Sequence, residues 1–170
     1  MKKKYTFIDL FAGCGGVTEG FLQTGRYEAL AHVEWEMPMV NTLRHRLVQK
    51  WNHTEIDAKK RVVCFDIQKT DESIRYLETP NYRNVLSFLE SEPFQVLIMG
   101  HSCGNSDRTL LNTIFEYKNC VFIKPYYYIK EDGTDNYIEL VQNISRNLTD
   151  MKLMRDRVVN KTQCEPLVKE

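Results

Sequence analysis

The chain has 170 residues, of which 42% are apolar and 27% are charged, and its 23 basic and 23 acidic side chains cancel. This size and composition predict a globular domain with a substantial core, and they exclude a chain dominated by low-complexity sequence. The neutral balance leaves nucleic acid open as a partner, because binding depends on where the charges lie. It nevertheless disfavours tight DNA binding by this chain alone.

The five cysteines are widely spaced, at positions 14, 64, 103, 120 and 164. Without a Cys-x-x-Cys pair or a secretory signal, we expect neither a zinc site nor disulfides. The amino-terminal apolar run is broken at Asp9, so it predicts neither a signal peptide nor a membrane span. Together these features predict a cytoplasmic protein that holds no metal.

Apolar runs alternate with amphipathic stretches along the chain. Strands are predicted at Tyr5–Phe11, Ala29–Val33, Arg61–Ile67, Phe94–Gly100 and Tyr126–Lys130. Helices are predicted at Val17–Thr24, Met37–Trp51, a broken region across Glu72–Glu90, Leu110–Lys118 and Tyr137–Leu148. Strands separated by helices imply βαβ units, so the predicted fold class is α/β with a parallel sheet. Ligands of such sheets bind beyond the carboxyl ends of the strands.

The first predicted strand runs into a glycine-rich turn, Gly13-Cys14-Gly15-Gly16. Glycine lets backbone amides approach a polar ligand closely, and the turn leads directly into a predicted helix. As a bare pattern, this arrangement fits nucleotides and adenosyl cofactors alike.

Polar side chains follow the next two predicted strands. Glu34 lies where a carboxylate can accept hydrogen bonds from both ribose hydroxyls, and the adjacent Trp35 can stack on an adenine face. The alternative is a solvated Glu34 beside a Trp35 that belongs to the core. Asp66 can accept a hydrogen bond from the adenine amine while Ile67 packs on the ring, or Asp66 can cap a following helix.

The segment FIDLFAGCGG, residues 7–16, closely resembles the opening motif of the cytosine-C5 DNA methyltransferases. In that family the turn holds S-adenosylmethionine, and a Glu-aromatic pair follows the second strand. Residues 42–46 and 65–72 are also similar to one branch of the family. The resemblance implies a Rossmann-like S-adenosylmethionine-dependent methyltransferase sheet with S-adenosyl-L-methionine as cofactor. The implied cofactor-binding residues are Asp9, Phe11, Gly13, Gly15, Gly16, Glu34, Trp35, Asp66 and Ile67.

The fourth predicted strand leads into His101-Ser102-Cys103-Gly104, where the family has a Pro-Cys-Gln loop with a nucleophilic cysteine. The resemblance implies that the Cys103 thiolate attacks C6 of a cytosine rotated out of the duplex, so that C5 can take the methyl group. Ser102 replaces the proline and Gly104 the glutamine, so the loop loses a fixed φ angle and a polar side chain. The alternative is that Cys103 is a small buried residue.

The segment that runs from Lys124-Pro125 to Glu131-Asp132 resembles the family's Lys-Pro, apolar strand, Glu-Asn-Val segment. The resemblance implies that Glu131 contacts N3 and the exocyclic amine of the flipped cytosine and thereby favours attack at C6. The alternative is a solvated turn at residues 131–133, since Asp-Gly is a strong turn signal.

We predict a partial S-adenosylmethionine-binding methyltransferase domain over residues 1–150 and a tail over 151–170, with no target-recognition domain. Arg155–Val158 is a distant echo of the family's arginine segment, so the sheet is expected to be incomplete at its carboxyl end. The predicted function is a DNA (cytosine-5-)-methyltransferase, truncated or split, that acts on DNA in a restriction-modification or phage setting. A second chain carrying the recognition domain is one option for such an enzyme. The alternatives are a catalytically inactive cofactor-binding remnant or regulatory subunit, and an RNA cytosine methyltransferase.

Overall fold

The structure is a computed structural model that describes residues 4–64 and 81–168. The chain divides into two compact units, Met1–Lys69 (unit 1) and Thr70–Glu170 (unit 2). Both units combine helices with a small sheet whose strands pair in parallel, which confirms the predicted α/β class.

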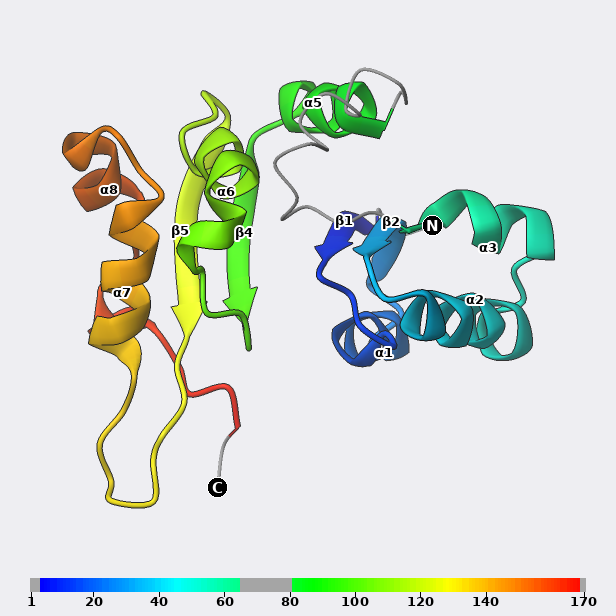
Figure 1. Ribbon diagram of the computed structural model, residues 1–170, viewed down its shortest axis with the longest axis horizontal. Helices are drawn as coiled ribbons and strands as arrows, with labels where there is room; N and C mark the ends of the chain where they lie inside the picture. Colours follow the sequence, from blue (N-terminus) through cyan, green and yellow to red (C-terminus); the bar gives the residue numbers. More distant parts are fainter. Residues whose placement is uncertain (1–3, 65–80, 169–170) are drawn as a thin grey trace. The chain divides into compact units, whose positions relative to one another are not determined.

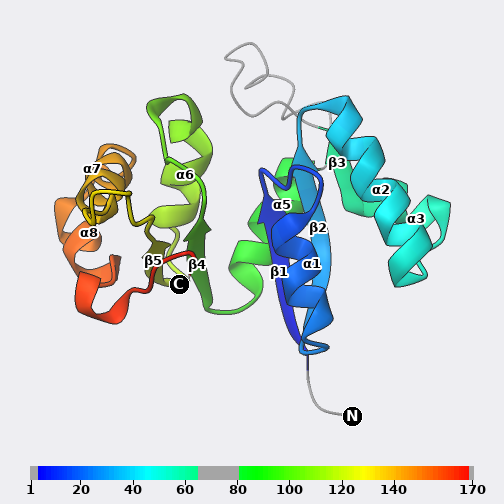
Figure 2. The same cartoon turned by 90° about the horizontal axis from the view of Figure 1, so that it is seen from below.

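Unit 1 is a three-stranded sheet in the order β1-β2-β3 with helices packed against it. Its elements are β1 (Tyr5–Leu10), α1 (Gly16–Gln23), β2 (Tyr27–Glu34), α2 (Met37–Trp51), α3 (Glu55–Arg61) and β3 (Val62–Cys64). Figure 2 shows α1 against β1 and β2, and α2 and α3 beside β3. The buried residues of its core are Ala12, Val40, Leu43, Leu47, Ala58 and Val62. The turn that follows β1 therefore rests, through Ala12, on the face of α2.

A β-bulge in β2 decides which of its side chains lie on the same face. Phe7 pairs with Ala29 but the next residue of β1 pairs with Ala31, so Leu30 is an extra residue in β2. A bulge shifts the in-and-out alternation by one position. As a result Ala29, His32 and Glu34 are all buried although their spacing is three and then two residues.

Unit 2 contains the parallel pair β4-β5, and helices precede and follow each of these two strands along the chain. Its elements are α5 (Asn81–Ser91), β4 (Phe94–Met99), η1 (Asn105–Asp107), α6 (Arg108–Phe115), β5 (Cys120–Tyr126), α7 (Tyr137–Arg146), α8 (Met151–Arg157) and η2 (Lys161–Gln163). Figure 1 shows β4 and β5 side by side, with α7 and α8 beyond β5. The chain after α8 runs along β5, because Val158 bridges Ile123 and Pro166 bridges Tyr127 in parallel. In the described part of the chain, no helix is long and apolar enough to cross a membrane.

The predicted strand at Tyr126–Lys130 is wrong, since the strand occupies Cys120–Tyr126. Tyr126 pairs with Met99, the last residue of β4, and Gly100 then turns the chain away with a φ of 74°. β5 therefore loses its partner strand after Tyr126, whatever the β propensity of the tyrosines that follow.

Two short helices were missed, and each carries a capping signal. Thr54 caps α3 by accepting a hydrogen bond from Asp57 N, and Asp150 caps α8 by accepting from Lys152 N and Leu153 N. Such caps before short charged segments are sequence signals for a helix start. The other predicted elements are confirmed with bounds shifted by a few residues, and α2 has the predicted bounds. The predicted strand and helix segments that fall on residues 65–80 lie outside the described residues.

Candidate functional site in unit 1

The turn after β1 is tight and needs glycine at one position above all. Gly13 and Gly15 have φ angles of 54° and 88°, and Phe11 has a φ of 61°. A Cβ on Gly15 would lie 2.5 Å from Leu43 Cδ1, whereas a Cβ on Gly16 would meet nothing within 4 Å. Gly15 is thus required both by its left-handed backbone and by the close approach of α2. At Gly16, the first residue of α1, neither the backbone conformation nor a close contact requires glycine.

The buried Glu34 carboxylate holds this turn against the end of β2. Gly13 N donates to Glu34 Oε2 at 2.7 Å, and the amides of Trp35 and Glu36 donate to Glu34 Oε1 at 2.9 Å each. A carboxylate has about four acceptor positions, so three are filled and about one is left for another donor. The sequence predicted a ribose-binding role for Glu34. The structure adds a role in ordering the turn that the sequence did not indicate.

A buried hydrogen-bond chain links Asp9 to β2 through α1. The Thr18 hydroxyl donates to Asp9 Oδ2 at 2.6 Å and lies 3.0 Å from His32 Nδ1. Because the hydroxyl hydrogen is directed at Asp9, His32 Nδ1–H must be the donor to Thr18 Oγ1. In the neutral imidazole with its hydrogen on Nδ1, Nε2 is unprotonated, and this atom finds no partner among the described residues. Neither Thr18 nor His32 was predicted as a site residue. Their only sequence signal is a polar side chain on an otherwise apolar helix or strand face.

Burial shifts the pKa values of Asp9 and His32, the two residues at the ends of this hydrogen-bond chain. Burial raises the pKa of Asp9, against the hydrogen bond from Thr18, and the nearby Glu34 raises it further. Burial also lowers the pKa of His32 to about 4, helped by Arg61 and His53. A protonated His32 would leave an Nε2–H donor without a partner, which agrees with the direction of the shift.

The His32 shift predicts acid destabilisation of unit 1. Its folded-state pKa of about 4 lies below the ordinary value of 6.5, so the unfolded chain binds the extra proton between these values. Stability that is present above pH 6.5 is therefore lost as the pH falls toward 4, by about 2 kcal/mol between pH 7 and pH 5. The raised pKa of Asp9 acts with the opposite sign. Urea unfolding at both pH values should show a smaller pH effect in His32→Asn, and an equal effect would contradict the assignment.

Apolar side chains are exposed around the turn. Trp35, predicted to cover an adenine ring, is 54% exposed at the end of β2 rather than part of the core. Val17, Met37 and Met39 are also exposed at the starts of α1 and α2. The alternative of a core Trp35 is thereby excluded for this structure, while its stacking role stays a prediction. Asp66 and Ile67, predicted to complete the site, lie outside the described residues.

Candidate catalytic residues in unit 2

Cys103 lies four residues after the end of β4 and is almost fully buried, at 1% exposure. It has a φ of 54°, which L residues other than Asn and Asp rarely adopt. Cys103 N donates to His101 Nδ1 at 3.1 Å, and His101 Nε2 lies 3.4 Å from the buried Asp107 Oδ2. Burial raises the pKa of the Cys103 thiol to about 12, and the negative charge of Asp107 acts in the same direction. A reactive thiol needs the opposite environment, so in this conformation Cys103 is protected.

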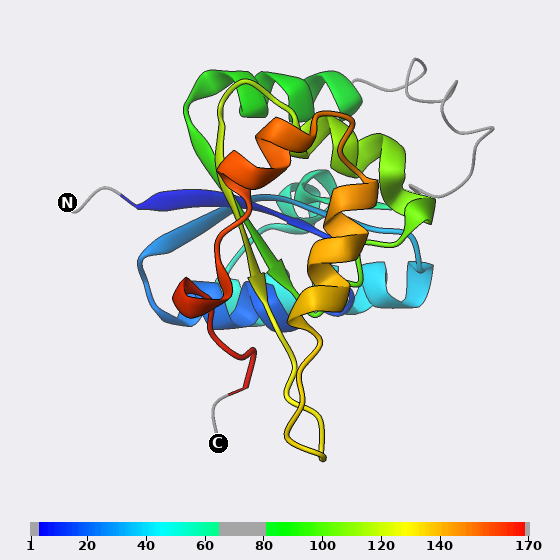
Figure 3. The same cartoon turned by 90° about the vertical axis from the view of Figure 1, so that its left-hand side faces the viewer.

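Glu131 lies in an exposed turn at the tip of the loop between β5 and α7. Lys130 N donates to Thr134 O at 2.7 Å and Gly133 N donates to Lys130 O at 2.9 Å, which closes the turn. Figures 1 and 3 show this loop extending beyond the end of β5. No hydrogen bond in the described part of the chain joins Glu131 to Cys103. The structure therefore shows the solvated turn that was the alternative, and the base-binding role of Glu131 stays a prediction.

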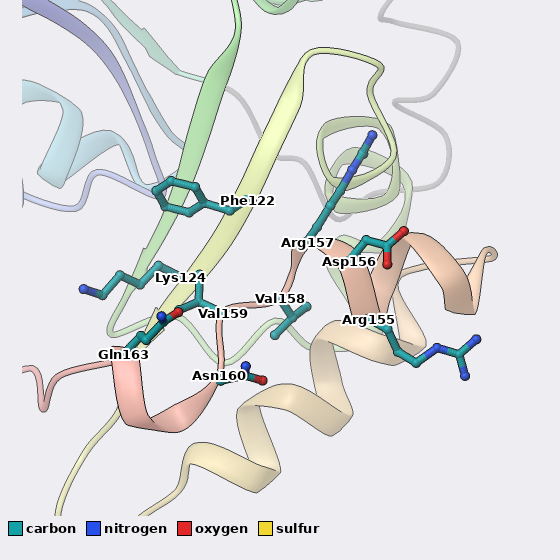
Figure 4. A pocket seen from close by; sticks show the side chains of 9 residues that line it. All are labelled: Phe122, Lys124, Arg155, Asp156, Arg157, Val158, Val159, Asn160 and Gln163. Atoms are coloured by element: carbon teal, nitrogen blue, oxygen red, sulfur yellow. The ribbon is translucent and has the colours of Figure 1, made fainter.

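A hollow of about 460 Å³ lies beside the arginine segment. Its lining residues are Phe122, Lys124, Arg155, Asp156, Arg157, Val158, Val159, Asn160 and Gln163. Figure 4 shows Lys124 and Arg155 pointing to opposite sides of the hollow. Arg157 donates to the carbonyl of Phe115 and so anchors α8 to α6. The cationic ends do not converge on one point, and we assign no ligand to this hollow.

Residues 5–78 match the family model of the C-5 cytosine-specific DNA methylases. The matched segment includes the turn, Glu34 and Trp35, together with Asp66 and Ile67, whereas Cys103 and Glu131 lie outside it. No curated protein matches the chain.

Proposed function

Because this chain belongs to the cytosine-C5 DNA methylase family, we propose that it binds S-adenosylmethionine at the turn of unit 1 and serves the methylation of cytosine in DNA. The observation that carries the proposal is the anchoring of Gly13 by the buried Glu34 carboxylate. This contact brings a glycine turn and an acidic side chain together at the carboxyl ends of two parallel strands, where nucleotide-like ligands of α/β sheets bind. We propose accordingly that the sheet is of the Rossmann-like methyltransferase type.

The residues around the turn suit this cofactor chemically. Asp9 and the Glu34 carboxylate lie close enough to influence each other, and together they favour a ligand with positive charge. S-adenosylmethionine carries a sulfonium and an ammonium group, and when bound it would supply an electrophilic methyl group. The remaining acceptor position of Glu34 suits a ribose hydroxyl, and the exposed Trp35 ring suits an adenine face. Asp66 and Ile67 would complete the adenine site.

For chemistry, we propose that Cys103 is the nucleophile and Glu131 the residue that binds N3 of the cytosine. The thiolate sulfur would bond to C6, and the electron pair of the C5–C6 double bond would bond to the methyl group as the methyl–sulfur bond of the sulfonium breaks. Loss of the C5 proton to a base would then expel the thiolate. The base must leave the duplex for this to happen. Cys103 must first become accessible and lose its proton, because its thiol is buried with a pKa of about 12.

That same burial favours a second candidate function, a cofactor-binding or regulatory chain that does not itself catalyse. A recognition domain on a second chain, a restriction-modification setting and a cytoplasmic location stay predictions.

Transfer of a labelled methyl group to DNA separates the two candidates. The purified chain is incubated with methyl-labelled S-adenosylmethionine and cytosine-containing duplex DNA, with a parallel RNA arm and a Cys103→Ser variant. Label in DNA that is lost in Cys103→Ser supports the enzyme. Cofactor binding without transfer supports the regulatory chain, and transfer to RNA alone would contradict the proposed substrate.

A further inference from the structure

Two asparagines of the α7 segment hold the carbonyl groups of the cysteine loop. Asn147 Nδ2 donates to Cys103 O at 2.8 Å, and Asn143 Nδ2 donates to Ser102 O at 2.9 Å. The partners are 44 and 41 residues apart in sequence, so these are tertiary contacts between α7 and the loop that follows β4. We call this pair the Asn143–Asn147 clamp.

The orientation of the Asn147 amide is set by its surroundings. Asn147 is 0% exposed, and its Nδ2 also donates to Asn143 O at 2.8 Å. Two carbonyl oxygens thus face the same nitrogen, and the reverse orientation would place Asn147 Oδ1 against both of them. Asn112 Nδ2 donates to Asn147 O at 3.0 Å, which ties the same residue to α6.

The clamp, together with His101, leaves the main polar groups of the loop satisfied. Ser102 O and Cys103 O accept from the two asparagines, and Cys103 N donates to His101 Nδ1. The left-handed backbone of Cys103 carries a conformational cost, so surrounding contacts must hold it in place. The clamp supplies such contacts at a loop where serine stands in place of a rigid proline.

We propose that Asn143 and Asn147 are positioning residues for Cys103, which fix its loop in the conformation that buries the thiol. Access of any reactant to Cys103 then depends on release of the cysteine loop from α7. The inference rests on the proposed function for the role of Cys103 as nucleophile, but the clamp itself is tested without cofactor or DNA.

The experiment compares Asn147→Asp with Asn119→Asp in the full chain. Asn119 is a matched control, because its Nδ2 donates to the carbonyls of Leu89 and Glu90 at 3.0 Å each, in the same unit but away from Cys103. Aspartate keeps the volume of asparagine and replaces the donor by an acceptor, so the clamp is broken without a cavity. The readout is the rate of alkylation of each cysteine by iodoacetamide, resolved by mass spectrometry of peptides.

In the wild type, Cys103 should react far more slowly than the exposed Cys14 and Cys64. In Asn147→Asp the Cys103 rate should rise about tenfold or more, because two hydrogen bonds to carbonyls are replaced by repulsion. The buried Cys120 and Cys164 should stay slow, and Asn119→Asp should leave Cys103 slow. Asn143 is partly exposed, so Asn143→Asp should raise the Cys103 alkylation rate by a smaller factor. This second variant also tests the clamp if Asn147→Asp does not fold.

Two results would overturn the proposal. One is an unchanged Cys103 rate in both clamp variants. The other is an equal rise at Cys103, Cys120 and Cys164, since that would mean that the asparagines stabilise unit 2 as a whole. A working clamp without methyl transfer would leave the positioning role standing and remove only the proposed function.

Discussion

Replacing Gly15 by alanine is expected to destabilise unit 1 by about 2–5 kcal/mol and to leave weak or no binding of S-adenosylhomocysteine. A residue with a Cβ loses about 1–2 kcal/mol of stability in the left-handed conformation that Gly15 adopts, with a φ of 88°. Overpacking of the new Cβ against Leu43 costs about 1–3 kcal/mol more. Leu43 is 1% exposed, so it has little room to yield to a Cβ 2.5 Å from its Cδ1. Urea unfolding followed by circular dichroism measures the stability change.

Gly16→Ala is the matched control for this prediction. It changes the adjacent glycine of the same turn, where φ is not positive and no atom lies within 4 Å of the new Cβ. It should be neutral or slightly stabilising, because alanine is the better residue inside a helix. Equal stability of the two variants would contradict the described turn geometry.

Glu34→Gln is expected to weaken S-adenosylhomocysteine binding at least tenfold and to lower the free energy of unfolding by about 2 kcal/mol. Glutamine keeps the size of the side chain, but its amide nitrogen would face the Gly13 N–H that now donates to Glu34 Oε2. The turn would lose its anchor, and the site would lose a negative charge beside Asp9.

Glu28→Gln provides the comparison, because Glu28 lies on the same strand but is exposed. It removes the same charge without touching the turn, so binding and stability should stay near the wild-type values. Titration calorimetry measures the affinity. Wild-type affinity together with wild-type stability in Glu34→Gln would show that the carboxylate neither orders the turn nor contacts the ligand.

The sequence predicted the parts of unit 1 that depend on local pattern. An apolar run, a glycine turn and an amphipathic segment follow each other directly, so β1, the turn and α1 could be placed within one or two residues. The predicted helix Met37–Trp51 has the bounds observed for α2, and Pro38 lies in the first turn of that helix, where proline is favoured. The carboxylate at the end of β2 could be singled out for the same reason, since strand ends are where ligands of parallel sheets bind.

What could not be predicted depends on pairing between distant residues. The extra residue Leu30 changes the face of His32 and Glu34, and a bulge of this kind leaves no local signature. The hydrogen bond from Gly13 N to Glu34 spans 21 residues, and the bond from Asn147 to Cys103 spans 44. The burial of Cys103, and with it the raised pKa of its thiol, follows from such packing and not from the loop sequence.

The most direct test is calorimetric titration of the folded full chain with S-adenosylhomocysteine. We predict saturable binding at about one site per chain, with weak or no binding in Gly15→Ala, weaker binding in Glu34→Gln and wild-type binding in Glu28→Gln. A folded wild-type chain that binds no S-adenosylhomocysteine would contradict the assignment of the unit 1 turn as a cofactor site.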